Sequence, residues 1–164
     1  MKRTGIYVFL IVGILLLGSG VSAAANALIG VIDLDVVMDE SDAGKLANGD
    51  LGNLIAGWQE TLDSLEATIL ELQEANPESE ELPGLVEDYQ IAAAEAEYVI
   101  QQRAEELYQL LLQDIALVAR TIGERDGYTI IAETSSLFYY GPHVDLTPEV
   151  IREYNRLLSE IETK

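Results

Sequence analysis

The sequence contains no cysteine and only one histidine, His143. Disulfide bonds are therefore excluded, as is a lipid attached to an N-terminal cysteine, and stability must come from packing or from association. A lone histidine in a Gly-Pro-His segment gives no basis for a zinc site or a His-dependent catalytic triad. We expect His143 to be an ordinary loop residue.

Basic residues are also scarce. The chain of 164 residues has 9 lysines and arginines against 29 acidic residues, a net charge of −20. Between residues 46 and 119, sixteen residues are acidic and Arg103 alone is basic. Such a charge disfavours nucleic acids and anionic membrane surfaces as partners, because both are themselves negative.

The hydrophobic run near the N-terminus, Ile6 to Leu17, is about a dozen residues, whereas a membrane-spanning helix needs roughly 20. A basic pair precedes it and a run of small residues follows, which is the order of a secretory signal peptide. We therefore expect a signal peptide over residues 1–25, cleaved after Ala23 or Ala25, with an uncleaved anchor as the alternative. Residues 26–164 are expected to form one domain that works outside the cytoplasm.

A β-branched segment at about residues 28–37 is too short for a helix and too apolar for a surface loop, so it is predicted to form a strand. A helix is predicted to begin near Ser41, and its apolar residues then recur at alternating spacings of 4 and 3, as in a coiled coil. We expect core packing for Trp58, which follows this seam. The predicted seam consists of Leu51, Ile55, Trp58, Leu62, Leu65, Ile69 and Leu72.

Two prolines and a glycine interrupt the helical pattern between residues 76 and 84. A second apolar stripe then runs from about Leu85 to Glu124. Two helices of this length joined by a short turn lie antiparallel, each covering the seam of the other. The segment at about 42–124 is therefore predicted to be a coiled-coil hairpin whose arms extend roughly 50 Å.

The chain after the hairpin predicts a small sheet and a last helix. Strands are expected at about 128–133 and 137–141, and a helix at about 148–162 with Thr147 as N-cap and Pro148 at its first position. The predicted fold class is α+β, with the hairpin projecting from a small β-sheet body. Because a small open sheet leaves unpaired edges, several copies are expected to associate through this body. The residues expected to be buried between copies are Ile29, Val31, Ile130, Phe138 and Tyr140.

Three parts of the sequence carry a resemblance to a known family. They are Ile29 to Asp35, Gly127 to Glu133 with Leu137 to Tyr140, and Val144 to Ile151. With the predicted order of elements, they resemble the Skp/OmpH family of periplasmic holdase chaperones, which carry outer-membrane proteins across the periplasm. The resemblance implies a homotrimer whose helical arms enclose a cavity for an unfolded client, without nucleotide hydrolysis.

The charge departs from what the family leads us to expect, namely a basic protein. An acidic arm repels anionic lipid head groups, so lipopolysaccharide binding is not carried over from the family. Two explanations of the acidity stay open. One is adaptation to a salty envelope, and the other is a preference for cationic clients.

Holding an unfolded client requires accessible apolar side chains that make many weak contacts. The candidates on the arms lie off or beside the seams, and the alternative for each is that it widens the interface within the hairpin. The candidate client-binding residues are Leu54, Leu70, Ile91 and Val99.

Nothing in the sequence supports catalysis. A phosphate-binding glycine loop and a nucleophile elbow are both absent, so no enzymatic activity and no cofactor are expected. Asp33 and Asp35 are interpreted as a solvated or hydrogen-bonded strand face, and the acidic tip at 78–81 lacks the spacing of a calcium loop, so no metal is expected. The resulting hypothesis is an ATP-independent periplasmic holdase for unfolded outer-membrane proteins. The alternative is a structural coiled-coil spacer or scaffold of the cell envelope.

Overall fold

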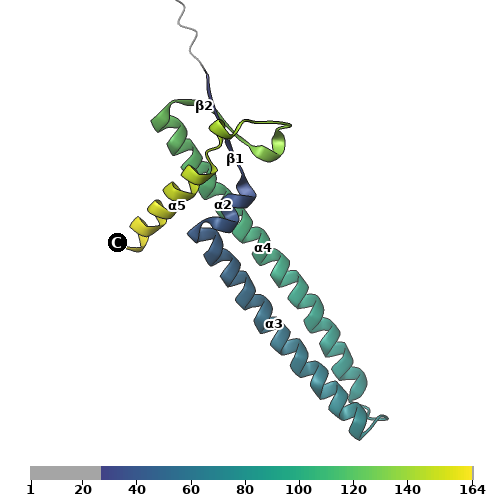
Figure 1. Cartoon of the computed structure of the whole chain (residues 1–164). Helices are drawn as coiled ribbons and strands as arrows, with labels where there is room; N and C mark the ends of the chain where they lie inside the picture. Colours follow the sequence, from purple (N-terminus) through teal and green to yellow (C-terminus); the bar gives the residue numbers. More distant parts are fainter. Residues whose placement is uncertain (1–26, 164) are drawn as a thin grey trace, which may run out of the picture.

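The computed structural model describes residues 27–163, and the signal peptide expected at 1–25 lies outside this part of the chain. The described chain has two parts, a small body and a long helical arm that projects from it (Figure 1). The elements in chain order are β1 (Leu28–Ile32), α2 (Leu34–Glu40), α3 (Asp42–Ala75), α4 (Leu82–Asp126), β2 (Tyr128–Glu133), the 3₁₀ turns η1 (Thr134–Ser136) and η2 (Pro142–Val144), and α5 (Thr147–Glu162).

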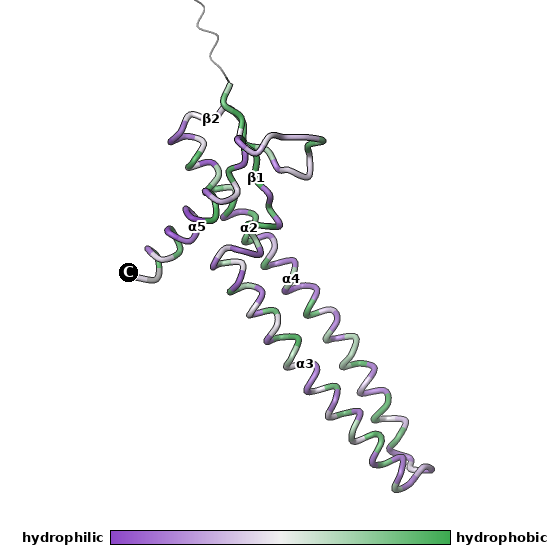
Figure 2. The backbone as a smooth tube through the Cα atoms, viewed as in Figure 1, coloured by the Kyte–Doolittle hydropathy of each residue, from purple (hydrophilic) through white to green (hydrophobic). Residues whose placement is uncertain are grey.

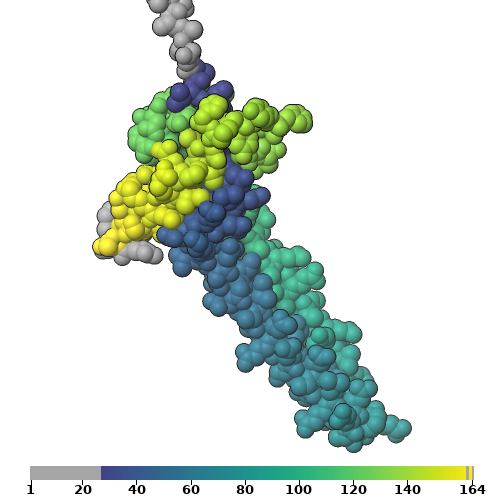
Figure 3. All heavy atoms as spheres, viewed as in Figure 1, coloured from purple at the N-terminus to yellow at the C-terminus, as the bar shows by residue number. Residues whose placement is uncertain are grey.

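The arm is an antiparallel hairpin of α3 and α4, joined by a short turn after Ala75. The side chain of Ser41 caps the first turn of α3, and α4 ends at Gly127, whose φ of 79° lies in the left-handed region that glycine adopts readily. The space-filling view shows the arm extending away from the body as a narrow rod (Figure 3). The predicted α+β fold with a helical hairpin is thus confirmed. None of the helices in residues 27–163 is both long enough and apolar enough to cross a membrane.

The sheet of the body has two strands in the described chain. β1 and β2 pair in parallel, with Ile29 opposite Ile130 and Val31 opposite Ala132, so the whole hairpin lies between two paired strands. On its other side, β1 is held to the start of α5, because the Val31 carbonyl accepts a hydrogen bond from the Leu146 N–H at 2.8 Å. The strands therefore bring together the chain segments that precede and follow the helical hairpin.

The core of the body lies where α2, the last turns of α4 and α5 meet. Val37, Ile122 and Val150 are completely buried there. Full burial of such a side chain contributes about 1.5–3 kcal/mol. The remaining buried residues of this core are Ile32, Ile115, Val118, Leu146 and Tyr154.

The strand predicted at residues 28–37 ends at Ile32, so its second half was predicted wrongly. Asp33 caps a helix there: its Oδ1 accepts a hydrogen bond from the Val36 N–H at 3.1 Å. α2 then buries Val37 against the core. Asp33 and Asp35 consequently do not share a strand face, since one is an N-cap and the other lies in the first helical turn.

The strand predicted at 137–141 is also absent, because this segment has no hydrogen-bonded partner strand in the described chain. The backbone at Leu137 and Gly141 is extended, as expected for a strand. Thr147 is not the N-cap of α5, which begins at Thr147 itself. Its hydroxyl instead accepts a hydrogen bond from the Asp33 N–H at 2.9 Å, so it joins α5 to the end of β1.

Candidate functional site

The two helices of the arm contact each other along most of the predicted seam. Leu51, Trp58, Leu62, Leu65, Ile69 and Leu72 are all partly buried. Ile55 is different, since 41% of its surface is exposed, and Leu54 is partly buried instead. The expected places of Ile55 on the seam and Leu54 off it are therefore reversed. Residues three or four positions apart both lie on one helical stripe. Spacing alone therefore does not decide whether Leu54 or Ile55 faces the partner helix.

Two of the four candidate client-binding residues are open to solvent. Leu70 on α3 is 53% exposed and Ile91 on α4 is 57% exposed. Val99 is partly buried and lines a shallow groove with Leu54 and Tyr98. Colouring by hydropathy shows hydrophobic residues interspersed with hydrophilic ones along both helices to the tip of the arm (Figure 2).

Tyr98 was not predicted as a site residue, yet it is 63% exposed and the most exposed aromatic residue of the arm. It lies seven residues after Ile91, a spacing that places two residues on nearly the same face of a helix. That spacing was the available signal. Ile91 and Tyr98 thus lie on nearly the same face of α4, and Tyr98 lines the shallow groove.

Arg103 is the one basic residue between positions 46 and 119, and the hairpin uses it internally. Its guanidinium donates to Asp50 Oδ2 from Nη2 at 2.6 Å and from Nε at 3.0 Å, which ties α4 to α3. Nη1 donates to Glu106 at 3.2 Å. The hydrogen bonds that Arg103 donates to Asp50 and Glu106 raise its pKa further above the ordinary value. Because both carboxylates already hold this cation, it is poorly available to an anionic ligand.

The root of the arm is fastened to the body by polar contacts. Ser41 is completely buried, and its Oγ accepts a hydrogen bond from the Gly44 N–H at 3.1 Å. Asn155 on α5 accepts from the Asp42 N–H at 2.9 Å. The Tyr154 hydroxyl donates to Asp114 at 2.9 Å, and burial together with this bond raises the pKa of Tyr154.

Several large apolar side chains are also exposed on the body. Four of the five residues predicted to be buried between copies are open here: Ile29 is 48% exposed, Ile130 54%, Tyr140 37%, and Phe138 is fully exposed. Ile29 and Ile130 are direct neighbours in the register of the sheet. Val31 was predicted wrongly, because its own chain already buries it. We call the four exposed residues, with Leu28, Leu137 and Tyr139, the body patch.

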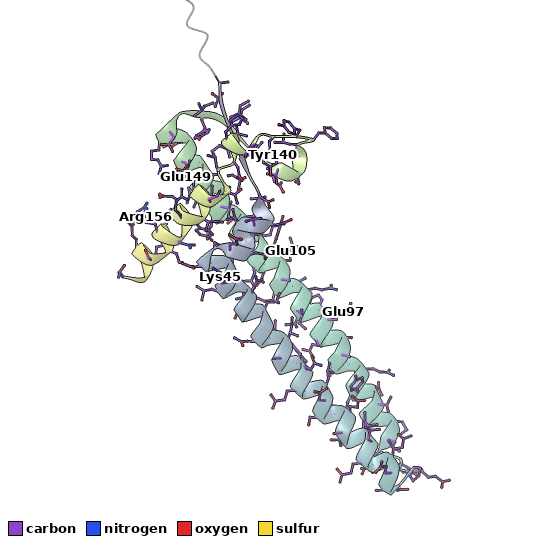
Figure 4. The ribbon with its side chains drawn as sticks, viewed as in Figure 1. Lys45, Glu97, Glu105, Tyr140, Glu149 and Arg156 are labelled. Carbon is purple, nitrogen blue, oxygen red and sulfur yellow. The ribbon has the colours of Figure 1, made fainter. Side chains whose placement is uncertain are left out.

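The body contains arginines that form ion pairs with neighbouring acidic residues. Arg125 and Arg156 lie here and form ion pairs with Asp126 and Glu153, and Arg125 also with Glu149, at 2.5–2.7 Å. Figure 4 shows Lys45, Glu149 and Arg156 around the body end of the molecule, and Glu97 and Glu105 along α4. His143 lies exposed in η2. Residues 27–163 contain no group of three potential metal-ligating side chains.

The geometry defines a class of protein, a small body that carries one helical arm with apolar side chains on its surface. The chain belongs to the OmpH-like outer membrane protein family, whose family model matches residues 28–154. A similar solved structure is that of a candidate OmpH-like outer membrane chaperone from Caulobacter crescentus CB15. The two share 14% sequence identity, the similarity covers 81% of this chain and 86% of that chain, and the TM-score is 0.45. Among curated proteins, no significant match was found.

Proposed function

We propose that this protein is an ATP-independent holdase chaperone of the periplasm that binds unfolded outer-membrane proteins. The observation that carries the proposal is the arm, where Leu70, Ile91 and Tyr98 remain more than half exposed on a long hairpin. A purely structural hairpin gains nothing from leaving large apolar side chains in water. Membership of the OmpH-like family supports a chaperone-type role.

The body patch serves association in this proposal. Exposed apolar surface on a small two-stranded sheet is covered when copies of the chain meet, and three copies would bring three arms around one cavity. Clients would be held between the arms by many weak contacts. Arms that are acidic along their length would not attract lipopolysaccharide, whose phosphates are negative, so we do not include it among the ligands.

Release of the client needs no energy source in this proposal. Each apolar contact is weak, and a client that reaches the outer membrane gains a more stable folded state there. The holding step is therefore reversible, and the protein acts by lowering the concentration of free unfolded chains.

The test is light scattering from a urea-unfolded outer-membrane barrel protein diluted into buffer with and without this protein. We expect this protein to suppress scattering at a ratio of about one trimer per client. The suppression should be lost when Leu70, Ile91 and Tyr98 are all replaced by serine. Replacement of the exposed polar residues Gln73, Gln90 and Gln101 by serine is the matched control and should leave suppression intact.

The mass of the protein is measured alongside. A Phe138→Ser variant, which removes one apolar side chain from the body patch, is measured in the same way. A stable trimer that fails to reduce scattering would contradict the chaperone proposal and favour a spacer with a folded partner. A monomeric parent protein would contradict the trimer alone.

A further inference from the structure

Two exposed apolar residues of the arm lie between glutamates on the same helix face. Residues four apart are neighbours on a helix surface, so a glutamate lies one turn before and one turn after each of these residues. All four glutamates are exposed. We call the two sets the acidic triads: Glu66, Leu70 and Glu74 on α3, and Glu87, Ile91 and Glu95 on α4.

The outer arm supplies no cation for these glutamates. Between residues 51 and 102 the sequence contains no lysine or arginine. Arg103, the nearest basic residue of α4, is already paired with Asp50 and Glu106. Within residues 27–163, the ion pairs involve none of the four triad glutamates. Their charges are therefore free to meet a cation from outside the chain.

The charge also decides between possible occupants. A second copy of the arm carries the same carboxylates and is repelled, as are nucleic acids and anionic lipid surfaces. A polypeptide with an apolar side chain flanked by lysine or arginine matches both the apolar centre and the negative flanks of a triad. We propose that the two acidic triads select unfolded clients whose apolar segments are flanked by basic residues. This inference rests on the proposed holdase function and specifies its substrate class.

The contacts at the triads are individually weak and strongly dependent on salt. An exposed ion pair contributes little, but several pairs on one client act together, because the first contact raises the local concentration for the next. The screening length falls from about 30 Å at 0.01 M salt to about 3 Å at 1 M. Selection for basic segments should therefore be strong at low salt and vanish at high salt, while apolar binding persists.

The test compares two fluorescent unstructured peptides with the same apolar positions, separated by lysine in one and by glutamate in the other. Affinity for the full protein is measured by anisotropy at both salt concentrations. We expect the lysine peptide to bind at least about tenfold more tightly at low salt and about equally at high salt. Replacing the four triad glutamates by glutamine should remove most of this preference.

The matched control replaces Glu78, Glu80, Glu81 and Glu97 by glutamine, which removes the same charge outside the triads. If this control loses as much of the preference for the lysine peptide as the triad variant does, the preference comes from the overall negative charge of the arm and not from the triads. Equal binding of both peptides at low salt would overturn the inference and leave the holdase function standing. Failure to bind either peptide would also overturn it, and the light-scattering result then decides the holdase function separately.

Discussion

At the scale of single residues, two glycines of α3 have opposite surroundings. A methyl group added to Gly44 would lie 1.6 Å from the Met38 carbonyl oxygen, whereas nothing lies within 4 Å of one added to Gly52. We expect Gly44→Ala to destabilise the protein by about 1–3 kcal/mol, because the backbone must move. Gly52→Ala should stabilise it by about 0.5–1 kcal/mol, because alanine restricts the unfolded chain and favours the helix.

Urea unfolding followed by circular dichroism measures both changes in the free energy of unfolding. Gly49→Ala is a further control, since nothing lies within 4 Å of its added methyl group either. Destabilisation by Gly52→Ala and Gly49→Ala alike would show that this part of α3 is not a regular helix in solution.

Tyr154 makes the stability of the body dependent on pH at the alkaline end. Burial and the hydrogen bond to Asp114 raise its pKa in the folded state, while the unfolded residue ionises near pH 10. Above about pH 10 the unfolded chain therefore loses a proton that the folded chain retains, and stability falls as the pH rises. We expect the urea midpoint to drop above pH 10, and to drop less in Tyr154→Phe. Parallel curves for the two proteins would contradict the assignment to Tyr154.

At the scale of elements, α4 belongs to both parts of the molecule. Its first turns form the arm, and its last turns bury Ile115, Val118 and Ile122 in the core of the body. Ile122→Ala should cost about 2–5 kcal/mol, since it leaves a cavity in this core. Leu70→Ala, on the exposed arm, should change the free energy of unfolding by less than about 0.5 kcal/mol. A cost for Leu70→Ala as large as that for Ile122→Ala in thermal or urea unfolding would contradict the assignment of the stability to the core of the body.

The same elements show how far the sequence predicts the structure. The hairpin was predictable because apolar residues repeat over many turns and two prolines mark its tip. The end of β1 was not predicted, because Val36 and Val37 suit a strand or a buried helix equally, and the Asp33 cap decides between them. The segment 137–141 has extended backbone at its ends, but a strand also needs a partner, which sequence composition does not reveal.

The candidate site was predictable in part for a related reason. Helical spacing shows which residues share a face, and it correctly singled out Leu70 and Ile91 as lying off the seam. It did not distinguish Leu54 from Ile55, because adjacent residues near the edge of a seam differ in exposure only through the local rotation of two helices. Val31 shows the same limit in the sheet, because alternation along a strand does not reveal which residues the rest of the same chain buries.

At the scale of the whole molecule, the net charge of −20 opposes folding and association through self-repulsion. Salt screens this repulsion, so the urea midpoint should rise between about 0.01 M and about 1 M sodium chloride. Salt also strengthens apolar burial, and the variant with four triad glutamates replaced by glutamine separates the two effects. It should begin with a higher midpoint and rise less than the parent protein. An equal rise in both proteins would mean that salt acts through apolar burial and that the charge of the arm is no obstacle to folding.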